Sequence, residues 1–243
     1  MYGTIPEVML RPFFNTLIIA AASAIAVDAG AQDRTIGLLA MPEVFGPRAC
    51  APFEPQDVAL HAAPNDGAPF AFVRVDQNWS FAPHGGCEGL EVSVHQGEQR
   101  RELPTLEFDY EMPGAIVVER RDGWFRIRLG NRTAWVNAPS AGRFMPLGDL
   151  YEEFVGVTAI SESFTARLTS APGSTGGPIM PRVAPGQPVR VLEMRDASVQ
   201  VEVLSNSACT AADNGPPEVV ATGWLPLHDQ SGTPTVWFSS RGC

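Results

Sequence analysis

The side chains best suited to chemistry in this 243-residue chain are its four cysteines and four histidines, the residue types that bind metals or act as a nucleophile and its base. They are Cys50, Cys87, Cys209 and Cys243, with His61, His84, His95 and His228. A zinc site needs such residues at ligand spacing, yet the chain has no Cys-x-x-Cys pair. A catalytic thiolate needs a His base, and no histidine is adjacent to a cysteine. We therefore predict no metal, no cofactor and no cysteine catalysis, and expect solvated or hydrogen-bonded histidines.

A second candidate for chemistry is the glycine-rich segment 173–178, Gly-Ser-Thr-Gly-Gly-Pro, which resembles the nucleophile loop of trypsin-like proteases. Thr175 occupies the position of the attacking serine, and the histidine segment of such proteases is missing. The neighbouring carboxylates Glu152 and Glu153 do not share a helix face, so they are not an acid–base pair either. These patterns favour a turn and a solvated helix surface, and we predict that the protein is not an enzyme.

The best binding hypothesis rests on a group of aromatic side chains. Its members are Trp79, Phe81, His84, Phe108 and Tyr110. Such rings supply contact area for a peptide or glycan at a low entropic cost. The alternative, which we favour, is a small core that anchors this part of the chain, because a long excursion needs apolar burial of its own. Three further aromatics, Trp124, Trp135 and Trp224, are assigned to the main cores.

The composition limits the classes of partner. The chain has 27 acidic and 17 basic residues, all of the basic ones arginine, and a formal net charge of −10. Nucleic acid and anionic membrane surfaces are therefore disfavoured, because no basic stripe offsets the repulsion. The 44% of apolar residues suffices for a core, while 23 glycines and 22 prolines indicate many turns.

The first 31 residues have the pattern of a secretory signal peptide. Arg11 precedes an apolar run over 13–27, and Ala29-Gly30-Ala31 follows as a cleavage site. The alternative is a membrane anchor, but the run is short for a span and rich in alanine. We expect cleavage after Ala31 and a mature protein without a membrane span, in the periplasm or outside the cell.

If the protein is exported, its four cysteines are expected to form disulfides. An even number of cysteines in an oxidising compartment predicts two disulfides, for which three pairings are possible. We favour Cys50–Cys87 and Cys209–Cys243, because each pair then stays within one half of the chain. In the chain-entropy model each would stabilise its half by roughly 3–4 kcal/mol.

The two halves carry the same local signals in the same order, which indicates an internal repeat. The signals are a Leu-x-x-x-Pro segment, a Pro-Gly turn, a β-branched strand, a charged turn, an alternating strand and a strand with Trp. In the first half they lie at 60–64, 113–114, 115–119, 121–123, 124–129 and 133–136. In the second half they lie at 168–172, 185–186, 189–193, 195–197, 199–204 and 222–225. The spacings differ by an insert at about 76–106 and another at about 205–219.

Short strands, frequent turns and little helical periodicity predict small antiparallel β-barrels. In 124–129, arginines alternate with apolar residues, which is typical of a strand with one buried face. The one helix candidate is 147–155, where Pro146 near the start fits the first helical turn. Its apolar stripe consists of Leu147, Leu150, Tyr151 and Phe154.

These segments resemble bacterial SH3-like (SH3b) domains. The segment 60–64 looks like the opening Leu-Arg-x-x-Pro strand of that family, 113–128 like its central hairpin and 133–136 like its closing Gly-Trp-Val strand. The second half is a more diverged match that lacks the hairpin tryptophan. His61 stands where the family usually has Arg. The insert at 76–106 interrupts the first copy and disturbs the groove through which SH3-like domains bind peptides or cell-wall material.

The expected fold is therefore all-β, with two small SH3-like β-barrels joined by a short helical connector. The expected segments are the signal peptide 1–31, a first barrel at 50–137, a connector at 138–164 and a second barrel at 165–243.

The signal pattern, the repeat and the missing catalytic set, taken with the resemblance, predict an exported, non-catalytic binding or scaffolding module of the bacterial cell envelope, with a protein, a peptide or a peptidoglycan fragment as its partner. One alternative is a peptidoglycan-directed envelope hydrolase or its accessory subunit. Another is a structural envelope protein whose barrels only pack against a partner.

Overall fold

The computed structural model describes residues 33–45, 54, 56–75, 92–109, 112–153, 157–162, 164–174, 181–207 and 215–239. The expected signal peptide, 1–31, lies outside the described residues, as do all four cysteines and therefore both expected disulfides. Four of the five aromatic candidates, Trp79, Phe81, His84 and Tyr110, also lie outside them.

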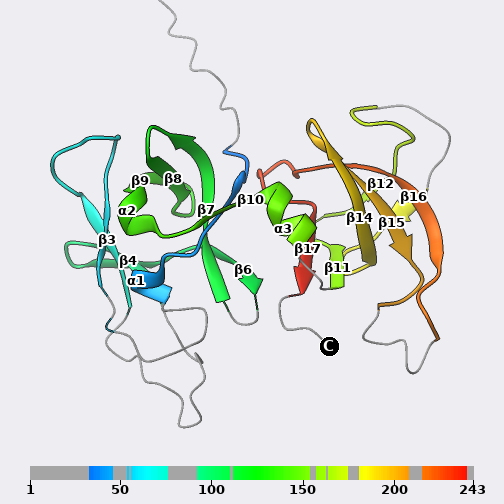
Figure 1. The fold of residues 1–243 in the computed structure, drawn as a ribbon, viewed down its shortest axis with the longest axis horizontal. Coiled ribbons are helices and arrows are strands. Elements are labelled where there is room, and N and C mark those ends of the chain that lie inside the picture. Colours follow the sequence, from blue (N-terminus) through cyan, green and yellow to red (C-terminus); the bar gives the residue numbers. More distant parts are fainter. Residues whose placement is uncertain are drawn as a thin grey trace, which may run out of the picture. The chain divides into compact units, whose positions relative to one another are not determined.

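Strands dominate the described part, which confirms the all-β class (Figure 1). They are short and antiparallel, and tight turns separate them. Asp122 and Asp196 occupy equivalent turns with φ values of 48° and 53°, a left-handed conformation that Asp tolerates better than most residues. Within the described ranges, no sheet closes into a barrel.

The first sheet has six strands in the order β10-β1-β7-β8-β9, with β6 paired to β7. They are β1 (Gly37–Leu39), β6 (Thr105–Asp109), β7 (Met112–Arg121), β8 (Trp124–Arg128), β9 (Thr133–Asn137) and β10 (Phe144–Pro146). Strands β1 and β10 lie outside the range 50–137 that the repeat indicates for the first barrel, yet they pair with each other, and β1 also pairs with β7.

The second large sheet has five strands in the order β16-β15-β14-β11-β17. They are β11 (Val157–Ile160), β14 (Pro188–Arg195), β15 (Ser198–Leu204), β16 (Val219–Pro226) and β17 (Val236–Ser239). A separate two-stranded sheet joins β12 (Ala166–Arg167) to β13 (Arg182–Val183). Strand β11 comes from the segment expected to be connector.

The two large sheets share one plan. In each, three consecutive strands form a meander, an earlier strand pairs with the first of the three, and a final strand pairs with that earlier strand. His61 and Trp135 exchange backbone hydrogen bonds of 2.9 and 2.8 Å, and Thr169 and Trp224 exchange two of 2.9 Å. In the alignment of the two halves, His61 is equivalent to Thr169 and Trp135 is equivalent to Trp224. The same contact therefore occurs at the same place in each half.

A four-stranded sheet in the order β2-β3-β4-β5 stands beside the first large sheet. Its strands are β2 (Val58–Leu60), β3 (Ala71–Val75), β4 (Val92–Gln96) and β5 (Gln99–Glu102). Strands β4 and β5 come from the expected insert at 76–106. The insert therefore extends a sheet by regular strand pairing, since β4 pairs with β3 in register.

Each half has its own apolar core. The first includes Leu60, Val73 and Val94 from the four-stranded sheet together with Val117 and Ile127 from β7 and β8. The second joins β14, β15 and β16 to residues of β11, β13, β17 and α3. A third cluster joins Leu38, Phe108 and Ile116 to Phe238 of β17. As expected, Trp124, Trp135 and Trp224 are buried, at 7%, 8% and 6% exposure.

Three short helices occur in the described part: α1 (Pro42–Phe45), α2 (Ala138–Ala141) and α3 (Leu147–Glu153). The sequence predicts α3 but not the other two, which are single turns beside proline. Leu147 and Leu150 are buried, and the hydroxyl of Tyr151 donates to the carbonyl of Val236. Burial raises the pKa of Tyr151. None of the helices described has the length and apolar character needed to cross a bilayer.

Candidate functional site

The candidate site is a groove beside the four-stranded sheet. It encloses about 450 Å³, including space open to solvent. One wall is the hairpin of β4 and β5, and the other is the turn between β8 and β9 with the residue before β3. The lining residues are Phe70, Val94, Gln96, Gln99, Arg101, Glu102, Leu129, Arg132 and Thr133.

Side chains along β4 and β5 alternate between the two faces of the sheet, and this alternation determines which of them form the first wall of the groove. Val73 pairs with Val94, and Val94 pairs with Arg101, so the three residues form a row across β3, β4 and β5. Residues directly opposite each other in an antiparallel sheet point to the same face. Val73 and Val94 are buried in the first core, whereas Arg101 is exposed. The same face of the sheet is therefore buried in the core at β3 and forms a wall of the groove at β5.

The next row on this face is Gln96 opposite Gln99. The chain reverses between them at Gly97, whose φ of +57° suits glycine. The opposite wall reverses in a similar way at Gly130, with a φ of +76°, and the N–H of Leu129 donates to the carbonyl of Arg132 at 2.7 Å. Two glycine-dependent turns thus set the two sides of the groove.

The floor of the groove is apolar and its rim is polar. Phe70, Val94 and Leu129 supply the apolar surface, and Phe70 is 37% exposed, which is unusual for so large an apolar side chain. The rim carries the guanidinium groups of Arg101 and Arg132 and the amides of Gln96 and Gln99. This combination suits a ligand with an apolar group and hydrogen-bonding groups next to it.

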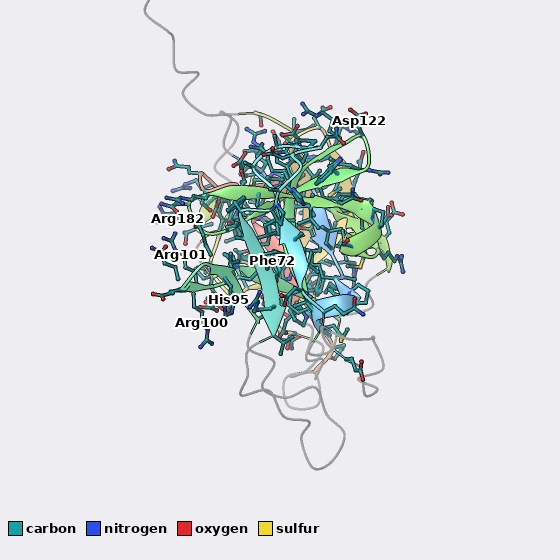
Figure 2. The ribbon with its side chains drawn as sticks, turned by 90° about the vertical axis from the view of Figure 1, so that its left-hand side faces the viewer. Phe72, His95, Arg100, Arg101, Asp122 and Arg182 are labelled. Atoms are coloured by element: carbon teal, nitrogen blue, oxygen red, sulfur yellow. The ribbon has the colours of Figure 1, made fainter. Side chains whose placement is uncertain are left out.

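The other face of the same sheet carries a different set of side chains. Phe72 pairs with His95, and His95 with Arg100, and Figure 2 labels these residues together with Arg101. His95 shares a hydrogen bond of 2.7 Å with the hydroxyl of Ser93. Consecutive arginines on β5 thus belong to opposite faces, Arg101 to the groove and Arg100 to the face of Phe72.

Of the five aromatic residues proposed from the sequence, the structure describes Phe108 alone. It is 8% exposed and packs in the third cluster with Leu38 and Met112. Phe108 is therefore a core residue in contact with β1 and β7, and both the aromatic site and the aromatic mini-core of the insert stay predictions. Trp79, Phe81, His84 and Tyr110 stay predictions, since they lie outside the described residues.

The other chemical candidates do not come together. His61 makes an edge-on contact with Trp124, with ring centroids 5.2 Å apart, and His228 bonds the carbonyl of Thr35. Ser174 donates its hydroxyl to the carbonyl of Ala171 within a turn, at 2.8 Å. Within the described ranges, no three His, Cys, Asp or Glu residues are grouped as metal ligands.

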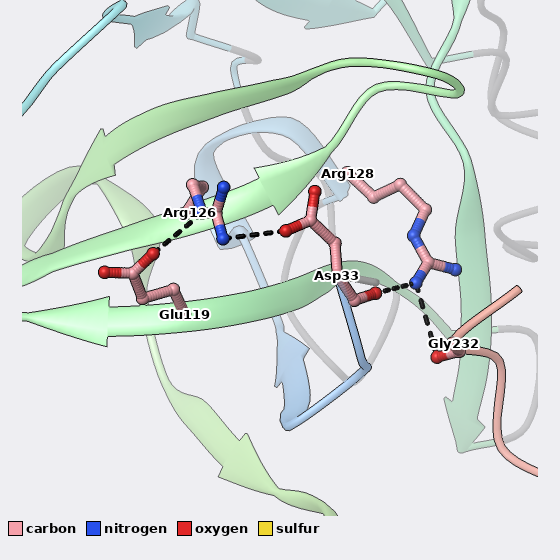
Figure 3. Close-up of polar contacts among 5 residues, drawn as sticks. All are labelled: Asp33, Glu119, Arg126, Arg128 and Gly232. Carbon is pink, nitrogen blue, oxygen red and sulfur yellow. Dashed lines mark hydrogen bonds and ion pairs between the residues drawn. The ribbon is translucent and has the colours of Figure 1, made fainter. Parts of the chain in front are cut away.

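A polar junction holds the segment before β1 between β8 and the 229–235 loop (Figure 3). Arg126 contacts the carboxylates of Asp33 and Glu119, at 2.7 and 2.9 Å. Arg128, on the same strand, donates to the main-chain carbonyls of Asp33 and Gly232. The contacts from β8 to Asp33 and Gly232 join residues 93 to 104 positions apart, so we assign the junction a structural role.

Two groups of this junction have shifted pKa values. Burial lowers the pKa of Arg128, against the opposing effect of Asp33 and Asp229. Burial also lowers the pKa of His228 below 6.5; Arg34 and Arg128 act in the same direction, while the hydrogen bond to Thr35 and the charge of Asp229 oppose it.

The groove was missed from the sequence because its residues are ordinary surface types. The run Gln99-Arg100-Arg101-Glu102 has no apolar member, so it gives no strand signal by itself. A usable signal is the Gly97 turn, which follows the alternating run Val92-Ser93-Val94 and precedes a polar run of similar length. That pattern indicates a hairpin whose second strand is exposed.

No family model matches this chain, and no curated protein and no solved structure does so either.

Proposed function

We propose that this protein is an exported, non-catalytic binding or scaffolding module of the bacterial cell envelope, built from two SH3-like domains. Its ligand site is the groove between the β4–β5 hairpin and the turn that joins β8 to β9. The observation that carries the proposal is the apolar floor of Phe70, Val94 and Leu129, of which Phe70 is exposed, under a rim of arginine and glutamine. Grooves of this composition take an apolar side chain and hydrogen-bond the chain around it.

The shared plan of the two large sheets supports the SH3-like part of the proposal. In each sheet the strand that comes last in the chain returns to pair with the one that comes first, as expected for a small folded-over meander. The first core and the second core are separate clusters, which suits two copies of one domain.

Matched contacts between the two halves add to this support. Arg121 lies over the ring of Trp135, and Arg195 lies over the ring of Trp224, each at 5.4 Å. The carbonyl of Gly123 accepts from Ala138, and the carbonyl of Ala197 accepts from Leu227, each at 2.8 Å.

Export and disulfide bonding are further parts of the proposal, and they rest on the sequence. Residues 1–31 have the order of a secretory signal, and four cysteines follow in the rest of the chain. The acidic charge opposes adsorption to anionic wall polymers, so affinity for them would have to come from local contacts in the groove.

The experiment is a direct binding measurement with the full-length chain, produced by export so that the host processes it. Calorimetry against a panel of peptides and soluble peptidoglycan fragments should identify at least one ligand. Phe70→Ser should then abolish that binding, because it removes the largest apolar group of the floor. Val220→Ser is the matched control, since Val220 is an exposed apolar residue of the other large sheet.

Two results would count against the proposal. One is the absence of any ligand in the panel for a well-folded wild-type protein. The other is a ligand whose affinity is the same for wild type and Phe70→Ser.

A further inference from the structure

We propose that the groove binds an acidic peptide segment. An apolar side chain of the segment lies on the floor of Phe70, Val94 and Leu129, and a neighbouring Asp or Glu is held between Arg101 and Arg132. This inference rests on the proposed binding function and adds the chemical class of the ligand.

The first argument is the pairing state of the arginines. Four other arginines of the described part have a carboxylate partner: Arg74 with Asp57, Arg126 with Asp33 and Glu119, Arg190 with Glu202 and Arg195 with Glu193. Arg120 and Arg121 lie over aromatic rings instead. Among the described residues, Arg101 and Arg132 have none. The hydrogen bond of Arg101 is a long one to the amide oxygen of Gln99, at 3.4 Å.

The charge of the whole chain makes these two arginines more informative. With a formal net charge of −10, the chain has more carboxylates than guanidinium groups. Two guanidinium groups without a carboxylate partner, facing one groove from β5 and from the turn between β8 and β9, are the complement of a ligand carboxylate. A planar guanidinium also binds a carboxylate in a defined orientation, which gives specificity as well as attraction.

Glu102 also lines the groove and carries the opposite charge. It pairs with Ser93, one position away from the Val94–Arg101 row, so the alternation of β5 assigns its side chain to the face of Arg100. The charges on the groove face of the sheet and on the turn opposite it are therefore those of Arg101 and Arg132.

The remaining lining residues favour a peptide over a small acid. A small acid would use the two arginines and leave the floor of Phe70 and Leu129 in contact with water. A peptide also covers this floor, and the amides of Gln96 and Gln99 can donate to its carbonyls and accept from its N–H groups.

The test uses the full chain and peptides with acetylated N-termini and amidated C-termini. Each peptide carries Leu or Phe followed at varied spacing by Glu, and each has a counterpart with Gln in place of Glu. Blocked ends make the side chain the only carboxylate. Gln peptides with a free C-terminus form a separate arm, which reports on binding of a chain end.

The variant is Arg101→Gln, and the matched control is Arg100→Gln, which removes the same charge one position away on the opposite face of β5. We expect wild type to bind a set of Glu peptides and Arg101→Gln to weaken that binding by about tenfold, the loss of one charged hydrogen bond. Arg100→Gln should retain wild-type affinity, and added salt should weaken binding.

The outcomes separate this inference from the proposed function. Equal affinity for Glu and Gln peptides, or equal effects of Arg101→Gln and Arg100→Gln, would overturn the acidic ligand. Sensitivity of the same binding to Phe70→Ser would still support a ligand groove. Binding only by free C-termini would overturn an internal acidic segment. If no peptide and no peptidoglycan fragment binds, both proposals fail.

Discussion

The carboxylate of Asp33 lies 2.7 Å from the guanidinium of Arg126, although 93 positions separate the two residues in the chain. Asp33 precedes β1, and Arg126 is in the middle of β8. Arg128, two positions further along β8, binds the main-chain carbonyls of Asp33 and Gly232. One strand thus holds the segment before β1 and the loop before β17 with two neighbouring arginines.

The first prediction concerns this ion pair. Asp33→Asn should lower the free energy of unfolding by about 0.5–1 kcal/mol, because the pair is partly exposed and Arg126 keeps its contact with Glu119. A double-mutant cycle with Arg126→Gln, measured by urea unfolding, isolates the coupling between the two side chains. The coupling should decrease at high salt, and a coupling of zero at low salt would contradict the prediction.

The second prediction concerns pH. The pKa of His228 is below 6.5 in the folded protein, chiefly through burial, so the unfolded chain binds the proton more readily. The neutral imidazole therefore stabilises the fold above about pH 6.5, and this contribution is lost as the pH falls through 6.5 toward the folded pKa. His228→Gln should flatten the decrease in unfolding free energy between about pH 7 and pH 5, while its amide can still donate to Thr35.

The measurement for His228 is unfolding of wild type and variant over this pH range, together with an NMR titration of the imidazole. The slope attributed to one proton is at most about 1.4 kcal/mol per pH unit. A titration midpoint at or above 6.5, or identical pH profiles for the two proteins, would show that the prediction is wrong.

Much of the strand pattern follows from the sequence. The alternation of arginine with apolar residues in β8 is visible in the sequence, and Phe125 and Ile127 are buried while Arg126 and Arg128 are not. The repeat also makes His61 equivalent to Thr169 and Trp135 equivalent to Trp224. In the structure, His61 exchanges backbone hydrogen bonds with Trp135, and Thr169 does so with Trp224. Local periodicity and turn chemistry suffice for these features.

The pairing of strands that are far apart in the sequence could not be predicted from local periodicity. β1 is only Gly37–Leu39, too short for a periodic signal, yet it pairs with both β7 and β10. Gly37 is required there because a Cβ would lie 2.2 Å from the carbonyl oxygen of Met145. Such a close approach is decided by tertiary packing, and nothing in a three-residue segment indicates it.

The candidate site was even less visible. Aromatic residues are the usual candidates for a binding site in a sequence, but Phe108 packs in a core. The groove depends instead on Arg101, Arg132 and Gln99. These residues become a site only when a hairpin from 92–102 comes to face the turn at 129–133. Polar surface residues form a binding site only when the fold brings them together, and the sequence pattern does not show which of them will be neighbours.

The third prediction concerns the cysteines. Mass mapping of the exported protein under nonreducing conditions should find Cys50–Cys87 and Cys209–Cys243. Removing one pair by Cys50→Ser and Cys87→Ser should cost roughly 3–4 kcal/mol of unfolding free energy in the chain-entropy model. Free thiols, or a bond between Cys50 and the second half, would contradict the pairing.

The last prediction compares two glycines with nearly the same backbone conformation. Gly232 has a φ of +77°, and an added Cβ would lie 2.6 Å from the carbonyl oxygen of Asp33. Gly123 has a φ of +80°, and an added Cβ would meet nothing within 4 Å. Gly123→Ala should therefore cost only the strain of the left-handed conformation, about 1–2 kcal/mol.

Gly232→Ala should cost about 1–3 kcal/mol more than Gly123→Ala, because the methyl group must displace the main chain of Asp33. That displacement would also disturb the hydrogen bonds that Arg128 donates to Asp33 and Gly232. Urea unfolding of the two variants measures the difference directly. Equal losses would mean that the segment before β1 is free to move away from the 229–235 loop, and the structural role of the polar junction would then have to be abandoned.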